Sequence, residues 1–146
     1  SNTRLIMKTL FKNEAKKAKF IPMYADFASP EEGILHINKD IESNLPLSVA
    51  LLGMGADMHT ASLFPGSKNL RLALSKDAPN VVAVSAPGIP EPRVSLTARV
   101  LNASQEKHLV FFGVDKKRVL DEAMFLDPLS APVSAVLDGA VVHWAE

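Results

Sequence analysis

The stretch 47-LSVALLGMGADMHTASLFPGS-67 decides the fold. Its first part, residues 47–52, is apolar with little alternation, which is typical of a β-strand covered on both faces. Two glycines, an aspartate, a histidine, a threonine and a serine follow directly, within residues 53–62. In an open α/β sheet, ligands bind beyond the carboxyl ends of the strands. This stretch therefore predicts a buried strand that delivers a polar, glycine-containing loop to a ligand site.

Strand-like and helix-like segments alternate along the rest of the chain. Further apolar runs predict strands at residues 81–86, 109–114 and 140–144, and a short edge strand is expected at 19–24, where Pro22 removes a backbone donor. The alternation predicts the α/β class, with a mostly parallel, Rossmann-like sheet and helices on both faces, a three-layer αβα arrangement. We expect residues 1–146 to form a single α/β domain.

Helices are recognised by their caps and by the spacing of their apolar residues. Ser29, followed by Pro30 and Glu32, marks the start of a helix that should end before Pro46. One apolar face of that helix is predicted to consist of Ile34, Ile37 and Ile41. Asp115 is expected to cap the last helix. That last helix is expected at residues 116–125, and the other helices are expected at residues 3–17, 68–75 and 96–103.

Composition narrows the classes of partner and compartment. The chain has 146 residues, 47% of them hydrophobic, no net charge at pH 7 and no cysteine. Balanced charge gives no reason to expect nucleic acid or a membrane as partner, and the lack of cysteine excludes disulfides and thiolate chemistry. No apolar run approaches the roughly 20 residues of a membrane span. We therefore expect a cytoplasmic protein.

The loop after residue 52 carries groups suited to binding anions and moving protons. Gly53 and Gly55 would let the backbone turn and offer N–H groups to an anion, and a helix beginning near His59 or Thr60 would add its positive end. Asp57 can orient the His59 ring, so that His59 acts as a base.

Structural interpretations compete with this one. The Gly-Met-Gly string lacks the third glycine of a dinucleotide fingerprint, and Ser62 lacks the surroundings of a hydrolase nucleophile. A single histidine at a strand exit is more often structural than catalytic. The remaining histidines stand singly, without metal-ligand spacing, so no metal is expected: His36, His108 and His143. From the residues alone, the chain is an anion-binding α/β domain with a candidate histidine base.

The string 52-LGMGADMHTASLFPG-66 resembles the signature of the 6-phosphogluconolactonase family at every residue except Met58. A second block, 90-PEPRVSLT-97, and the Ser-Asn start of the first helix are also similar to that family. The resemblance implies hydrolysis of 6-phosphoglucono-δ-lactone to 6-phosphogluconate in the oxidative pentose phosphate pathway, without cofactor or metal. It implies His59 as the base and Asp57 as its partner. The implied substrate-binding residues are Gly53, Gly55, Thr60, Ser62, Arg93 and Asn2.

The chain departs from the family pattern in three places. Met58 replaces a glycine and should be strained if the position requires a positive φ. Gly88 stands where many members carry a lysine. Family members normally begin with a further stretch that carries a glycine/serine-rich phosphate loop and an Asp-Glu-Arg segment, so the chain resembles only the C-terminal part. We therefore expect a narrowed sheet with an exposed apolar edge and an inactive isolated chain.

Two other functions stay open beside the lactonase. A glucosamine-6-phosphate deaminase or isomerase shares the fold, but its string continues to an Asn-Glu pair that is absent after His59. A non-catalytic domain that binds sugar phosphates is the second alternative. The expected partner is a small phosphorylated sugar lactone, and the expected state is a monomer or a weak homodimer.

Overall fold

The computed structural model describes residues 2–23, 29–86, 88, 91 and 93–146, apart from the side chains of Asn2 and Pro30. Three parallel strands form one sheet in the order β1-β4-β5, namely β1 (Val49–Leu52), β4 (Glu106–Phe112) and β5 (Ala140–Ala145). Two antiparallel strands, β2 (Val81–Val84) and β3 (Arg93–Leu96), form a second sheet. The α/β class and the mostly parallel sheet are confirmed.

Strand β3 corrects the expectation of a helix from residue 96. The helix α4 begins later and spans Ala98–Asn102, because residues 93–96 pair with β2, with Val81 opposite Leu96 and Ala83 opposite Val94. The edge strand expected at residues 19–24 is not formed by the described residues 19–23, where Pro22 lacks a backbone donor.

The start of one helix agrees with the capping residues in the sequence, whereas two other helices differ from their predicted ranges. Helix α2 (Pro30–Glu42) begins as predicted, and Ser29 Oγ accepts a hydrogen bond from the Glu32 N–H at 3.3 Å. The expected helix over 3–17 is divided into α1 (Asn2–Thr9) and the 3₁₀ helix η1 (Asn13–Lys17). Asn13 has φ 51°, outside the right-handed helical region. Helix α3 is shorter than expected and spans Leu70–Ala73.

The start of α5 (Val114–Ala123) differs from the prediction that Asp115 caps it. Gly113 occupies the N-cap with φ 94°, which lets the chain turn immediately after β4. Asp115 lies in the first turn instead, where a negative charge interacts favourably with the helix dipole. A second 3₁₀ helix, η2 (Pro132–Val136), connects α5 to β5 along the chain.

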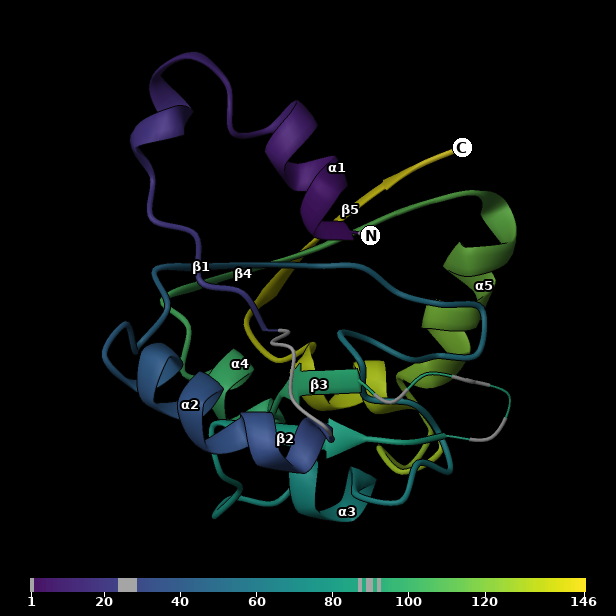
Figure 1. Ribbon diagram of the computed structural model, residues 1–146. Helices are drawn as coiled ribbons and strands as arrows, with labels where there is room; N and C mark the ends of the chain where they lie inside the picture. Colours follow the sequence, from purple (N-terminus) through teal and green to yellow (C-terminus); the bar gives the residue numbers. More distant parts are fainter. Residues whose placement is uncertain (1, 24–28, 87, 89–90, 92) are drawn as a thin grey trace.

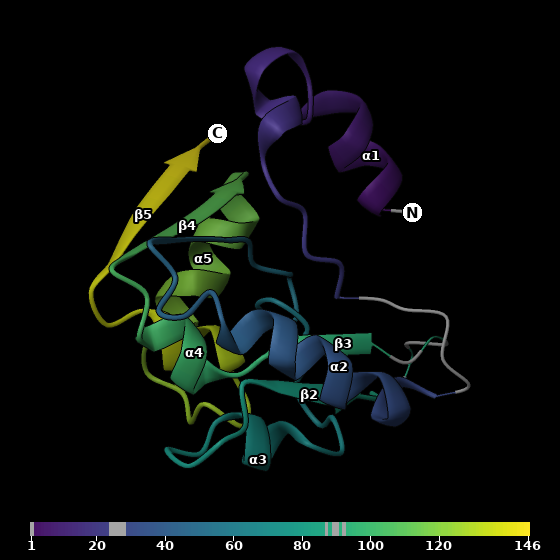
Figure 2. The ribbon, with the colours of Figure 1, turned by 60° about the vertical axis from the view of Figure 1, so that its left-hand side comes forward.

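The helices and sheets pack into one large and one small hydrophobic cluster (Figures 1 and 2). The main core joins inward-facing residues of β1 and β4 to β2, α3, α5 and η2, and its members include Leu52, Leu109, Val84 and Leu120. On another side of β2, Ile37 and Ile41 of α2 bury Val81, with Ile34 partly buried beside them, so the predicted isoleucine face is confirmed.

The described residues leave the opposite face of the parallel sheet largely uncovered. Its outward-facing apolar residues are strongly exposed: Val49 54%, Leu51 73% and Phe112 68%. Strand β1 was expected to be covered on both faces, and it instead alternates between exposed and buried residues. The expectation was an exposed apolar edge, whereas these residues form an exposed apolar face of the sheet. Among the described residues, no helix has the length and apolar character to cross a membrane.

Candidate active site

The segment after β1 folds into a compact loop at the carboxyl edge of the parallel sheet. Isolated bridges join Met54 to Thr60 and Thr60 to Leu63. The Gly55 N–H donates to the His59 carbonyl at 3.0 Å, and the Met58 N–H donates to the Gly55 carbonyl at 3.0 Å. Backbone hydrogen bonds therefore define the positions of residues 54–63 before any ligand binds.

No helix begins at His59 or Thr60, contrary to the expectation from sequence. Met58 has φ 67° and Ala61 has φ 50°, and a left-handed residue on each side of this segment is incompatible with a right-handed helix. The next helix along the chain is α3, which begins at Leu70. The helix N-terminus expected at these two residues is therefore not formed.

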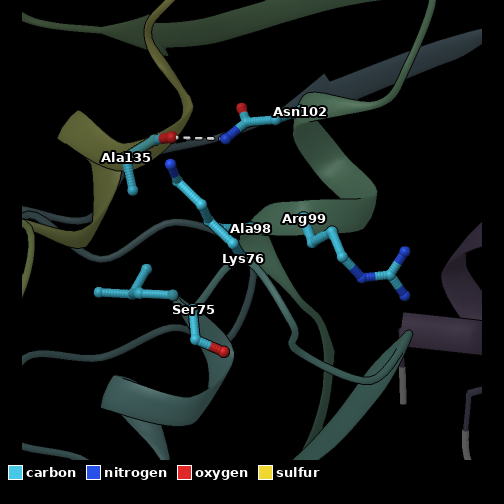
Figure 3. Close-up of a pocket in the computed structure, with 7 residues that line it drawn as sticks. Ser75, Lys76, Ala98, Arg99, Asn102 and Ala135 are labelled. Atoms are coloured by element: carbon cyan, nitrogen blue, oxygen red, sulfur yellow. Dashed lines mark hydrogen bonds between the residues drawn. The ribbon is translucent and has the colours of Figure 1, made fainter.

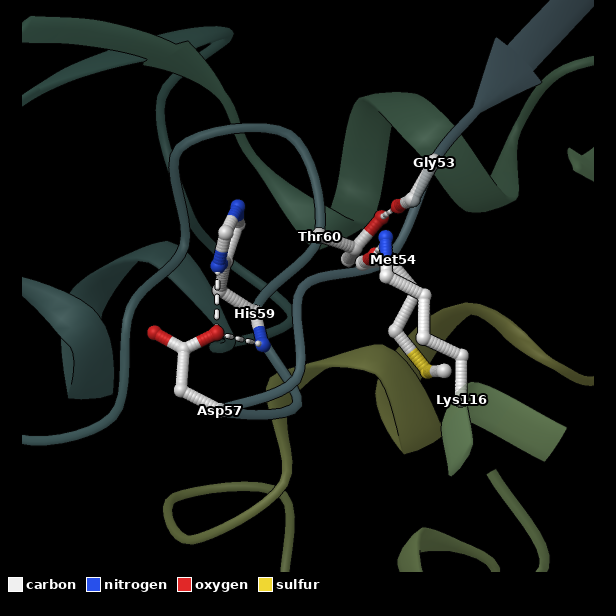
Figure 4. Close-up of polar contacts among 6 residues, drawn as sticks. All are labelled: Gly53, Met54, Asp57, His59, Thr60 and Lys116. Atoms are coloured by element: carbon white, nitrogen blue, oxygen red, sulfur yellow. Dashed lines mark hydrogen bonds and ion pairs between the residues drawn. The ribbon is translucent and has the colours of Figure 1, made fainter. Parts of the chain in front are cut away.

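His59 and Asp57 form a hydrogen-bonded pair within this loop (Figure 4). The imidazole Nδ1 lies 2.5 Å from Asp57 Oδ1, and the same oxygen accepts the His59 backbone N–H at 3.3 Å. The His59 side chain is 30% exposed and the Asp57 side chain 54%. A neutral imidazole that donates from Nδ1 keeps its lone pair on Nε2. The arrangement therefore leaves a basic nitrogen on a ring that is accessible to solvent.

The Asp57 carboxyl has a lowered pKa as a result of this pairing. Partial burial acts to raise the pKa, but hydrogen bonds from the His59 side chain and backbone, together with the charge of the imidazolium, outweigh it. Asp57 is therefore ionised at neutral pH. An ionised carboxylate on Nδ1 favours the tautomer with a free Nε2 and stabilises the imidazolium formed when Nε2 takes a proton.

Gly55 is required by the space that the pair occupies. Neither Gly53 nor Gly55 is among the glycines with positive φ, so a sharp turn is not the reason for a glycine at either position. A Cβ on Gly55 would lie 2.2 Å from His59 Nδ1 and 2.4 Å from Asp57 Oδ1. The Gly55 N–H is also already bonded to the His59 carbonyl, which differs from the expectation that it is offered to an anion.

Met58 occupies a conformation that glycine adopts more easily. Its φ of 67° lies in the left-handed region, which costs a non-glycine residue about 1–2 kcal/mol. Its carbonyl accepts the Val133 N–H at 3.0 Å, and its side chain packs against the main core. Met58 is therefore strained, as expected for a position that requires a positive φ, and packing offsets part of the strain.

Thr60 and Ser62 hold the loop from inside. Thr60 is fully buried, and its hydroxyl donates to the Gly53 carbonyl at 2.9 Å. The Ser62 backbone N–H donates to Ser95 Oγ at 3.1 Å, which ties the loop to β3. The expected substrate contact by Asn2 concerns a side chain that lies outside the described part of the chain, although its backbone begins α1.

Arg93 and His59 both contact the aromatic ring of Phe64. Its guanidinium carbon is 5.5 Å from the centroid of Phe64, and the His59 ring is 4.3 Å from the same centroid. Arg93 is the first residue of β3, whereas His59 belongs to the loop after β1. The fold thus brings the candidate base and a cation together from segments separated along the chain.

Lys116 is a residue of this region that sequence reasoning missed. Its ammonium donates to the Met54 carbonyl at 2.8 Å from the first turn of α5 (Figure 4). Strands β1 and β4 are adjacent and parallel, so the segments that leave their carboxyl ends must lie side by side. The position of Lys116 directly after the strand 106–112 was the signal in the sequence that could have found it.

The other histidines do not all stand singly, contrary to the expectation. His108 Nδ1 and His143 Nε2 lie 2.9 Å apart across β4 and β5, because neighbouring parallel strands place these residues on one face. Among the described residues, no group of three or more His, Cys, Asp or Glu side chains could hold a metal ion.

Two open hollows lie in the described surface. One, of about 290 Å³, borders the loop and is lined by Gly53, Ser62 and Ser95 together with apolar residues of β1 and β3. The other, of about 280 Å³, is lined by residues 74–76, which follow α3, and by residues of α4 and η2, including Arg99 and Asn102 (Figure 3). None of the candidate residues lines the second hollow. Gly53 and Ser62 line the first hollow, whereas the side chains of His59, Asp57 and Arg93 line neither of the two.

Several known proteins of similar sequence and structure are named 6-phosphogluconolactonase. The chain is 37% identical to a 6-phosphogluconolactonase of Pseudomonas aeruginosa, over 99% of this chain and 62% of that protein. It is 37% identical to one of Caulobacter vibrioides, over 100% of this chain and 65% of that protein. A crystal structure of a 6-phosphogluconolactonase from Shewanella baltica matches with a TM-score of 0.91 and 33% identity, over 99% of this chain and 64% of that one.

The chain therefore spans somewhat less than two thirds of the length of these relatives. The family model of glucosamine-6-phosphate isomerases/6-phosphogluconolactonase matches residues 1–144, which is almost the whole chain. The chain belongs to the glucosamine-6-phosphate isomerase/6-phosphogluconolactonase family.

Proposed function

We propose that the complete protein hydrolyses 6-phosphoglucono-δ-lactone to 6-phosphogluconate and that this chain carries the base of that reaction. The observation that carries the proposal is the His59–Asp57 pair, in which an accessible imidazole is oriented by an ionised carboxylate. Relatives named 6-phosphogluconolactonase support the choice of substrate. Residues 1–146 would form a single α/β domain, the C-terminal part of the enzyme.

The reaction needs one base and a site for the developing oxyanion. His59 Nε2 takes a proton from water, and the water oxygen forms a bond to the lactone carbonyl carbon. Asp57 stabilises the resulting imidazolium. Collapse of the tetrahedral oxyanion breaks the bond to the ring oxygen, which receives the proton from Nε2, and the new carboxylic acid ionises. A positioned base of this kind contributes about 10²–10⁴ in rate.

Arg93 is the proposed partner of the substrate phosphate. A guanidinium can bind two phosphate oxygens at once, which suits this task better than a point charge. Arg93 is exposed and contacts the ring that also contacts His59. We assign Ser62, Gly53 and Asn2 to the substrate side of the site, and Gly55 and Thr60 to the geometry of the loop.

The proposal extends to the state and location of the protein. We expect the isolated chain to be inactive, because relatives have a further third of their length. We also propose that the enzyme works in the cytoplasm, as a monomer or weak homodimer, on a small phosphorylated lactone. Neither nucleic acid nor a membrane is proposed as a partner.

The test measures turnover in the chain completed by the N-terminal part of a relative. His59→Ala should lower kcat at least about a hundredfold, and Arg93→Ala should mainly raise KM. Arg71→Ala is the matched control, because Arg71 is an exposed arginine of α3 outside the proposed site. Near-normal turnover of His59→Ala would remove the assignment of the base. Turnover of glucosamine 6-phosphate in place of the lactone would favour the deaminase.

A further inference from the structure

The Phe64 ring contacts the side chains of both His59 and Arg93. Its centroid lies 4.3 Å from that of the His59 ring, with 36° between the ring planes. The Arg93 guanidinium carbon lies 5.5 Å from the same centroid, within the range of a cation–π interaction. The Phe64 side chain therefore lies in contact with both the candidate base and the arginine proposed to bind the substrate phosphate.

Phe64 is anchored more firmly than either of its partners. It is 6% exposed and belongs to the main core, and its carbonyl accepts the Ser67 N–H at 3.1 Å. His59 and Arg93 are more exposed and come from different segments. Among the described residues, no carboxylate forms an ion pair with Arg93, so the ring is the contact that restricts its guanidinium.

We infer that Phe64 is a positioning residue that holds the His59 imidazole and the Arg93 guanidinium at a set separation. The consequence of this inference for substrate specificity rests on the proposed function. A base and a phosphate-binding cation held at one separation favour a lactone whose phosphate lies at the matching distance from its carbonyl carbon. Phe64 would thereby contribute to the discrimination between phosphorylated and unphosphorylated lactones, without itself touching either.

The size of the effect follows from the two contacts. Loss of a cation–π interaction at an exposed site corresponds to about a two- to fivefold change in affinity. Loss of an aromatic pair corresponds to about a two- to tenfold change in an equilibrium. An unrestrained arginine must also lose rotamer freedom when it binds a ligand. We therefore expect one substitution to lower kcat and to raise KM, each to a moderate extent.

The first experiment uses the 146-residue chain and does not depend on turnover. NMR should detect nuclear Overhauser contacts from the Phe64 ring to the His59 ring and to the Arg93 side chain. Titration with inorganic phosphate, followed at the Arg93 Nε–H resonance, should give a dissociation constant that rises about two- to fivefold in Phe64→Leu. Phe111→Leu is the matched control, because Phe111 is also a core phenylalanine, 3% exposed, on β4.

A second variant separates the ring's charge distribution from its packing. Pentafluorophenylalanine at position 64 keeps the shape of the ring but reverses its quadrupole, so it should weaken phosphate binding even if Phe64→Leu fails to fold. Phe64→Tyr keeps the ring and should bind phosphate like the parent chain. In Arg93→Ala, phosphate binding is followed at backbone amide resonances, since the Arg93 Nε–H is lost, and it should no longer depend on residue 64, because the partner of the ring is then absent.

Kinetics in the completed protein test the consequence for specificity. Phe64→Leu should lower kcat and raise KM for the phosphorylated lactone, and the ratio of kcat/KM for phosphorylated over unphosphorylated lactone should fall at least about twofold. Phe111→Leu should leave that ratio unchanged.

The inference is overturned if the nuclear Overhauser contacts are absent, or if Phe64→Leu and Phe111→Leu have the same effect on phosphate binding. If the parent protein hydrolyses no lactone, the proposed function fails, whereas the phosphate and NMR measurements still decide the role of Phe64.

Discussion

Substitution of Gly55 by alanine should displace the His59–Asp57 pair while leaving the fold intact. The added Cβ would lie 2.2 Å from His59 Nδ1, 2.3 Å from His59 Cε1 and 2.4 Å from Asp57 Oδ1. Contacts of this kind are favourable at about 3.5–4.0 Å, so both side chains must move by more than about 1 Å. The atoms in the way are the ends of side chains at the surface, which can move without disturbing the core.

The expected loss is catalytic rather than structural. A misplacement of about 1 Å in a reacting group can cost about a hundredfold in rate. The Asp57 carboxyl also offers a direct measurement, because its hydrogen bonds to His59 help to keep its pKa below the usual value. Titration of Asp57 by NMR should therefore show a higher pKa in Gly55→Ala than in the parent chain, with little change in the free energy of unfolding.

Gly53→Ala is the matched control for the geometry. Its Cβ would meet only the Val110 carbonyl, at 3.9 Å, and Gly53 is not among the glycines with positive φ. The Asp57 titration should be unchanged in this variant. An unchanged Asp57 titration in Gly55→Ala would refute the reasoning, since it would mean that the pair tolerates a methyl group in the space that it occupies.

Three further predictions concern stability and can be measured by denaturant unfolding. Met58→Gly should have a free energy of unfolding about 1 kcal/mol higher than that of Met58→Ala, because both variants lose the methionine side chain but only glycine adopts the left-handed backbone conformation without a steric cost. Equal stability of the two variants would contradict the backbone strain assigned to Met58. Lys116→Met should lower the free energy of unfolding by about 1 kcal/mol through loss of the hydrogen bond to Met54, and no loss would show that this bond is not formed in solution. The pKa of Asp57 is lowered in the folded chain, so its contribution to the free energy of unfolding is present above its unfolded pKa of about 3.9 and is lost as the pH falls through the folded value. The difference in free energy of unfolding between the parent chain and Asp57→Asn should therefore shrink over that acidic range. A constant difference would contradict the pairing of Asp57 with His59.

The candidate site was recognisable from sequence where its members are close along the chain. Asp57 and His59 are two residues apart, and a short loop lets a carboxylate reach its neighbouring ring, so their contact follows from local geometry. Arg93 was assigned by resemblance, and its approach to His59 depends on Phe64 and on the pairing of β3 with β2. The contact between Lys116 and Met54 depends on the adjacency of β1 and β4, which no local pattern reveals.

The amino-acid order by itself determined the segments that bury apolar surface, because hydrophobic runs and capping residues act over a few neighbouring positions. It also determined that a glycine-containing loop with Asp57 and His59 follows a strand. Only the tertiary structure decided that residues 93–96 form a strand, since their partner β2 lies earlier in the chain, and that Gly55 is needed for space rather than for its φ. Both outcomes depend on contacts between groups that meet only after the chain has folded.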